Sequence, residues 1–149
     1  MTALATELRH GRRLVDAGLF DRLVRFVVQE ERVTTERAER VMDQALAFLH
    51  MSAHRNEGLS PSQSVDPGWH AFMLHTREYA DWCQAQFGRF IHHNPFPEPQ
   101  LFDGAQMRAT VAAIEEAGFV VDHELWGTAS NCNPPACCGD GGGCGGGGS

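Results

Sequence analysis

The sequence contains no lysine: all 12 of its basic residues are arginines, set against 19 acidic residues, and the net charge is −7. This balance argues against non-specific binding to nucleic acid, which depends on clustered positive charge. The chain also has no run of 18 apolar residues, so no membrane span is predicted. Its first residues reach a charge at Glu7 before an apolar signal segment could form. We therefore expect a cytoplasmic protein whose partners include neither nucleic acid nor a membrane.

Common catalytic motifs are missing as well. The sequence has no Gly-x-Ser-x-Gly, no His-Glu-x-x-His and no glycine-rich loop between a predicted strand and helix. The one cysteine before the C-terminal tail, Cys83, falls among apolar positions, where a buried thiol is unreactive. These patterns disfavour an enzyme, and a small enzyme that uses the central histidines is the least supported of our hypotheses.

Apolar residues recur at helical intervals along most of the chain, which predicts an all-α domain of about five helices. Residues 1–127 would form this one domain, with a single modest core. After the last helix, which should end at Gly118, we expect a short extended piece and then Trp126 packed against the bundle. The predicted helices cover residues 3–16, 20–30, 34–54, 66–88 and 103–117.

The predicted helix of residues 66–88 and the segment after it hold most of the chemically informative side chains. Asp66 is expected to be the N-cap, with Pro67 at the first helical position, and the helix should close near Gly88. One stripe of this helix is predicted to face the core. It contains Trp69, Phe72, Met73, Thr76, Ala80, Cys83 and Phe87.

Half of the 8 histidines lie in or just after this helix. His70 and His75 fall about 140° apart around a helix, so they cannot bind one ion from the same face. The nearest further ligands are His92 and His93, and we predict a metal site formed by His70, His92 and His93, with nearby acids orienting the rings. The alternative is a hydrogen-bonded network that locks the helix to the segment after it.

A second histidine pair, His50 and His54, has the i, i+4 spacing that can bind a divalent metal on a helix. Both residues also lie in the last turn of a predicted helix, where histidine interacts favourably with the helix dipole. We prefer this second interpretation.

The residues Trp69-His70, Tyr79, Cys83 and Gly88–His93 together resemble the small bacterial members of the glycine-rich domain-containing protein family. Plant members carry Trp-His-x-His followed by a tyrosine and a cysteine at similar spacing, and Phe72 stands here in place of the second histidine. The resemblance covers residues 8–127, and the tail matches the family's glycine- and cysteine-rich ends. It implies a related fold rather than a particular reaction.

The composition changes at residue 128, and residues 128–149 contain no large apolar side chain. This segment is therefore predicted to be a flexible, disordered tail. Four thiolates in the tail could bind a soft or borderline metal ion such as Zn or Cu, and in an oxidising setting they could instead form two disulfides. The four are Cys132, Cys137, Cys138 and Cys144.

These patterns predict a non-catalytic metal-binding or interaction module, with a histidine-rich site on the central helix and a thiol-rich tail. The ion would be divalent or soft, with Zn and Cu as the candidates. A second hypothesis is a leader or carrier domain whose Cys/Gly tail is modified by other enzymes, as in ribosomally made peptides. In that case the partner would be a modifying protein.

Overall fold

The computed structural model describes residues 7–55, 59–93 and 104–127. Six α-helices and one short 3-10 helix lie in these ranges, where an isolated bridge is the only β pairing. The predicted all-α fold is therefore confirmed, while the predicted tail, residues 128–149, lies outside the described part of the chain. The elements are η1 (Gly11–Leu14), α1 (Ala17–Glu31), α2 (Thr35–His54), α3 (Asp66–Leu74), α4 (Thr76–Phe87), α5 (Gly104–Glu116) and α6 (His123–Trp126).

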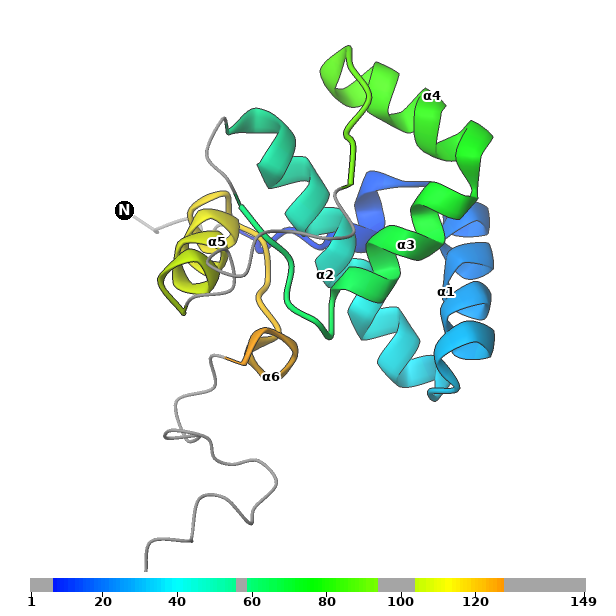
Figure 1. The fold of residues 1–149 in the computed structure, drawn as a ribbon, viewed down its shortest axis with the longest axis horizontal. Helices are drawn as coiled ribbons and strands as arrows, with labels where there is room; N and C mark the ends of the chain where they lie inside the picture. Colours follow the sequence, from blue (N-terminus) through cyan, green and yellow to red (C-terminus); the bar gives the residue numbers. More distant parts are fainter. Residues whose placement is uncertain (1–6, 56–58, 94–103, 128–149) are drawn as a thin grey trace, which may run out of the picture.

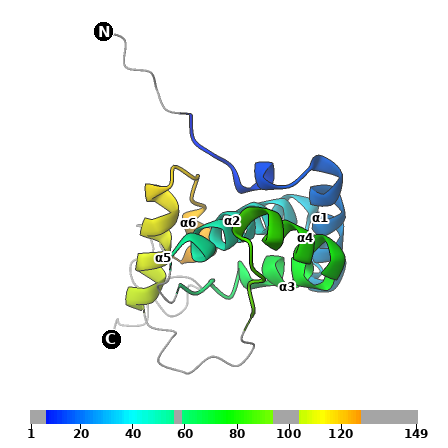
Figure 2. The same cartoon turned by 90° about the horizontal axis from the view of Figure 1, so that it is seen from above.

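Helix α2 is the centre of the fold. Figures 1 and 2 show it running through the middle of the molecule, with α1 and α3 on one side and α5 and α6 on the other. Every residue from Val41 to Leu49 is buried, on all sides of the helix, as expected for a helix with neighbours all around it. None of the described helices is long and apolar enough to cross a bilayer.

Side-chain caps set the starts of α1 and α2. The Asp16 carboxylate accepts a hydrogen bond of 2.9 Å from the Leu19 amide, and the Thr34 hydroxyl accepts one of 3.1 Å from the Arg37 amide. The predicted second and third helices are confirmed. Helix α1 begins three residues before the predicted start at residue 20 and includes Gly18, which does not interrupt it.

The predicted helix of residues 3–16 is wrong in its described part, which holds only the short 3-10 helix η1. Arg9 is extended: its amide donates to the Gly118 carbonyl at 2.8 Å, and its carbonyl accepts from the Val120 amide at 2.9 Å. Gly11 then lies against α2 so closely that a Cβ there would be 1.9 Å from the Asp43 carbonyl oxygen. These contacts with distant residues override the helical pattern, and the apolar Leu8 just before them is 59% exposed.

The predicted helical range of residues 66–88, with its end near Gly88, is confirmed, but it is wrong as a single helix because it contains two, α3 and α4. The chain leaves helical geometry at His75 (φ −86°, ψ 67°), and α4 starts in a new direction at Thr76. The bend changes which side chains of α4 are buried. Thr76 and Ala80, predicted to face the core, are exposed, while Tyr79 and Trp82 are buried beside Cys83.

The C-terminal part of the domain is attached to α2 through Gln44. Its amide oxygen accepts from the Trp126 indole at 2.8 Å and from the Asp122 amide at 3.0 Å, and its amide nitrogen donates to the Val120 carbonyl at 2.9 Å. The predicted packing of Trp126 against the bundle is confirmed. The predicted last helix is confirmed as α5, followed by Gly118 with a positive φ of 86°.

Candidate metal site

Three side chains converge at the start of α3. Asp66 is the first residue of that helix, His70 lies one turn later on the same face, and His93 comes from the segment that leaves α4. The two Nε2 atoms of His70 and His93 are 3.0 Å apart. The Asp66 carboxylate places Oδ1 2.9 Å from His93 Nε2 and Oδ2 3.1 Å from His70 Nε2. Two imidazoles and a carboxylate therefore meet in a triangle of side chains, with a different carboxylate oxygen facing each ring.

His93 is held over α3 by contacts on the inner side of its segment. Its ring packs on the Trp69 ring with centroids 4.3 Å apart. The Tyr79 hydroxyl accepts a hydrogen bond of 3.0 Å from the Trp69 indole and donates one of 2.6 Å to the Ile91 carbonyl. Burial raises the pKa of the Tyr79 hydroxyl, so it keeps the proton that it donates. These bonds tie the backbone just before His93 to both α3 and α4.

The start of α3 is fixed by its close approach to α2. A Cβ on Gly68 would lie 2.6 Å from the Cβ of Ala45 and 3.2 Å from the Val41 carbonyl oxygen. Only glycine allows the two helices to come this close without a shift of the backbone. Gly68 lies between Asp66 and His70, so this contact sets where both side chains project.

The three side chains differ in exposure. His70 is 47% exposed, Asp66 27% and His93 9%. The site is thus at the surface, with one ligand anchored against the core and another open to solvent, which gives an ion a direct path to it.

Hydrogen bonds alone do not fully account for the contacts among these three side chains. If each imidazole carries its proton on Nε2, both rings can donate to the Asp66 carboxylate. The two N–H groups of His70 and His93 then lie 3.0 Å apart with no acceptor between them. A metal ion in place of those protons would be a common partner for all three ligand atoms, and neutral imidazole nitrogens and a carboxylate are ordinary ligands of divalent ions.

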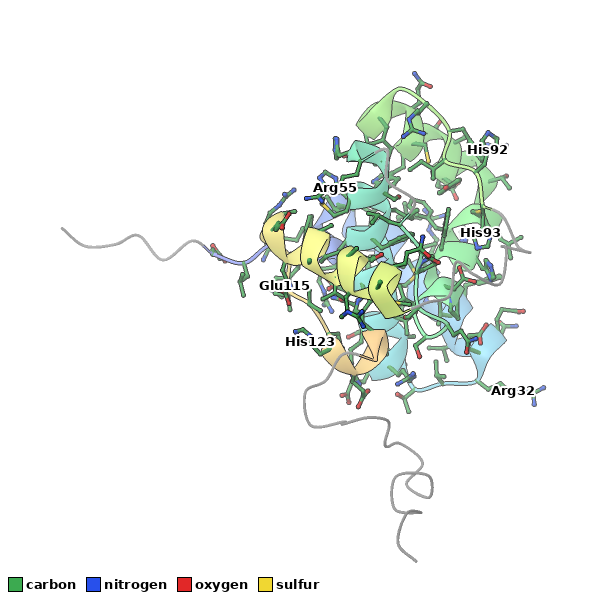
Figure 3. All side chains as sticks on the ribbon, turned by 60° about the vertical axis from the view of Figure 1, so that its left-hand side comes forward. Arg32, Arg55, His92, His93, Glu115 and His123 are labelled. Carbon is green, nitrogen blue, oxygen red and sulfur yellow. The ribbon has the colours of Figure 1, made fainter. Side chains whose placement is uncertain are left out.

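The structure does not bring His92 into this cluster. Its side chain is exposed and packs on the Phe90 ring with centroids 4.8 Å apart. Figure 3 labels His92 and His93 and shows them at different places along the segment that leaves α4. The four predicted tail ligands Cys132, Cys137, Cys138 and Cys144 lie outside the described residues.

The other histidine pair packs into an aromatic cluster. The rings of His50 and His54 are 4.6 Å apart, and both contact Phe87 while His50 also contacts Phe119. Burial, with a smaller contribution from His54, lowers the pKa of His50 to about 4. Across the described residues, the only group of three potential ligands is the one at Asp66, His70 and His93. Cys83 is fully buried, as predicted.

Sequence reasoning missed Asp66 as a possible ligand because it assigned that residue to the N-cap. Val65 occupies the cap position, and the Asp66 side chain is free to face the imidazoles. The i, i+4 spacing of Asp66 and His70 was the available signal. The acids that we expected to orient the rings lie elsewhere: Glu78 is 3.9 Å from Arg22, and Asp81 is exposed.

The fold and site together define a small all-α domain with a surface cluster of two histidines and an aspartate. The chain belongs to the UCP032817-like family, whose pattern it matches over residues 13–105. That range includes α1 to α4 and all three residues of the cluster. No curated protein and no solved structure matches the chain. The resemblance to the glycine-rich domain-containing protein family stays a prediction.

Proposed function

We propose that this domain is a binding module for a divalent metal ion, held by Asp66, His70 and His93. The observation that carries the proposal is the meeting of these three side chains: the two ring Nε2 atoms are 3.0 Å apart, and each has a different oxygen of the Asp66 carboxylate at 2.9 or 3.1 Å. Two of the side chains come from the start of α3 and the third comes from the segment after α4. Each could have been satisfied by solvent or by a different neighbour.

The ligand chemistry selects a class of ion. Imidazole nitrogen suits zinc and the late first-row divalent metals, whereas calcium and magnesium prefer an all-oxygen site. The domain site should therefore take Zn(II), Ni(II), Co(II), Fe(II) or Cu(II). Cu(I) favours thiolates, and it would go to the tail cysteines if it binds this chain at all.

The tail enters the proposal as a separate, thiol-based site. In a reducing cytoplasm, where we place the protein, Cys132, Cys137, Cys138 and Cys144 would remain thiols. They would then compete with the domain for zinc. An experiment on the domain site must remove this competition without shortening the chain.

The test is a calorimetric titration of the full-length chain in which all four tail cysteines are replaced by serine. We expect one Zn(II) per chain. His70→Ala removes one of the three ligands and Asp66→Asn replaces the carboxylate by a neutral amide, so each should weaken binding at least 10-fold. His92→Ala is the matched control: it deletes a neighbouring, exposed imidazole that lies outside the triangle, and it should leave the affinity unchanged.

The competing interpretation, a hydrogen-bonded lock between α3 and the segment after α4, predicts a different result. A lock would lose stability on His70→Ala but would bind no ion. Stoichiometric zinc binding that survives His70→Ala, or that is lost equally with His92→Ala, would contradict the proposed site.

A further inference from the structure

The geometry of the three ligand atoms also bears on what else the ion can bind. With metal–nitrogen bonds of about 2.1 Å, the 3.0 Å between the Nε2 atoms of His70 and His93 would subtend an angle of about 90° at the metal. A tetrahedral ion with the same bonds would need the two nitrogens about 3.4 Å apart. The nitrogen separation therefore favours an ion with more than four ligands, and such an ion has coordination positions that these three side chains do not fill.

The described part of the chain adds no further side chain of the usual metal-binding types to this cluster. No fourth histidine, cysteine, aspartate or glutamate joins Asp66, His70 and His93 there. A structural metal site is normally closed by four protein ligands, whereas three protein ligands with open positions leave room for water or an exogenous molecule.

Charge favours an anion at the open positions. A divalent ion bound by two neutral imidazoles and one carboxylate keeps one positive charge. Asp66 is the only acidic residue in the ligand set. The half-exposed His70 leaves the ion within reach of small molecules in solution.

We infer that the ion held by Asp66, His70 and His93 keeps open coordination positions and binds a small anionic oxygen donor, of the carboxylate or hydroxamate class. This inference rests on the proposed function and adds the class of ligand. A chelating anion occupies two of the open positions and neutralises the remaining charge, which explains the preference for oxygen donors that bind through two atoms.

Cobalt(II) provides the test, because its visible absorption reports both the coordination number and the ligand type. The full-length chain with four tail Cys→Ser substitutions is loaded with one equivalent of Co(II), and acetohydroxamate is then titrated in. We expect weak visible absorption before the addition and a saturable change with one hydroxamate per cobalt. The cobalt should stay with the protein through gel filtration, which identifies a ternary complex.

The native full-length chain is measured in parallel. Its separate thiol site can take up part of the cobalt, so the hydroxamate response is compared in the Cys→Ser chain, where His92→Ala is the matched control and should respond in the same way. In the native chain, an intense thiolate-to-cobalt band that is lost both on Cys→Ser and on His70→Ala would show that the tail closes the site. That result would overturn the inference.

The outcomes separate the two proposals. The inference fails if cobalt binds through His70 but its spectrum does not change when acetohydroxamate is added, or if the hydroxamate only removes the cobalt from the protein. In either case the proposed metal site stands. If cobalt does not bind, or binds equally well to His70→Ala, both fail.

Discussion

The Tyr79 hydroxyl donates a hydrogen bond of 2.6 Å to the Ile91 carbonyl, two residues before His93. The same oxygen accepts from the Trp69 indole, whose ring packs on that of His93. Tyr79 therefore connects the backbone of one ligand to the helix that carries the other two. Its role in the site is to position His93, since its own hydroxyl contacts none of the three ligand atoms.

Tyr79→Phe should weaken zinc binding by about 10-fold, the low end of the effect of outer-sphere partners on metal affinity. The change leaves a buried indole N–H and a buried carbonyl without their partner, which should lower the free energy of unfolding by about 2 kcal/mol. Calorimetric zinc titration and urea unfolding measure the two effects on the same samples.

Trp82→Phe is the matched control for that variant. It removes another hydrogen bond of α4, the partly buried 2.9 Å bond from the Trp82 indole to the Leu14 carbonyl, which leads away from the site. Stability should fall by a similar amount while zinc affinity is kept. Equal losses of affinity in both variants would show that general destabilisation, and not the position of His93, explains the effect.

Zinc should stabilise the folded domain, because the unfolded chain cannot hold the three ligands together. At free zinc of about 100 times the dissociation constant, the expected gain is about 2.7 kcal/mol in the Cys→Ser chain. Thermal unfolding followed by circular dichroism would record the corresponding rise in Tm. In His70→Ala the rise should be absent, and a rise of undiminished size there would count against the site.

Gly68→Ala should disturb both the fold and the site. The added methyl would meet Ala45 at 2.6 Å, and the separation of α3 from α2 would cost about 1–3 kcal/mol. Because Asp66 and His70 flank this position, zinc affinity should fall as well. Gly18→Ala in α1, where the nearest atom is an Asp16 carboxylate oxygen at 3.2 Å, should change stability by less than about 1 kcal/mol and leave zinc binding intact.

His50 should make the fold less stable in mild acid. Its pKa is lowered from 6.5 to about 4, so between these values the unfolded chain takes up a proton that the folded chain refuses. The contribution of His50 to the free energy of unfolding is complete above pH 6.5 and is lost as the pH falls towards 4. Since the ring is only partly buried, the loss should be on the order of 1 kcal/mol.

His50→Phe removes the titrating group and keeps an aromatic ring beside Phe87 and Phe119. Urea unfolding of this variant at pH 7 and pH 5 should show a smaller difference between the two conditions than the parent chain shows. His92→Gln removes an exposed imidazole and should leave the difference unchanged. A parent and a His50→Phe variant with the same pH dependence would refute this account.

Local patterns in the sequence were enough to predict much of the helical framework. The apolar spacing from Phe20 to Val28 and from Ala38 to Leu49, together with the Thr34 cap, specified α1 and α2 because those signals act within a few residues. The same kind of signal predicted α5 and the glycine after it. His70 and His93 could be proposed as partners because a short connection limits how far apart they can lie.

Tertiary contacts determined three features that local patterns did not predict. These are the break at His75, the extended path at Arg9 and the place of Asp66 among the ligands. The backbone of Arg9 pairs with Gly118 and Val120, which lie more than 100 residues later in the chain, and no local pattern carries that information. Asp66 was interpreted as a cap because a carboxylate at a helix start usually serves the backbone. Its partner here is instead His93, 27 residues away, which the Tyr79 bond and the Trp69 ring bring over the start of α3.

The sequence alone thus determined which segments become helices, because helix formation depends on residues that are close in the sequence. Only the packed structure decided which side chains meet at the site, because those distances depend on how the helices pack against α2.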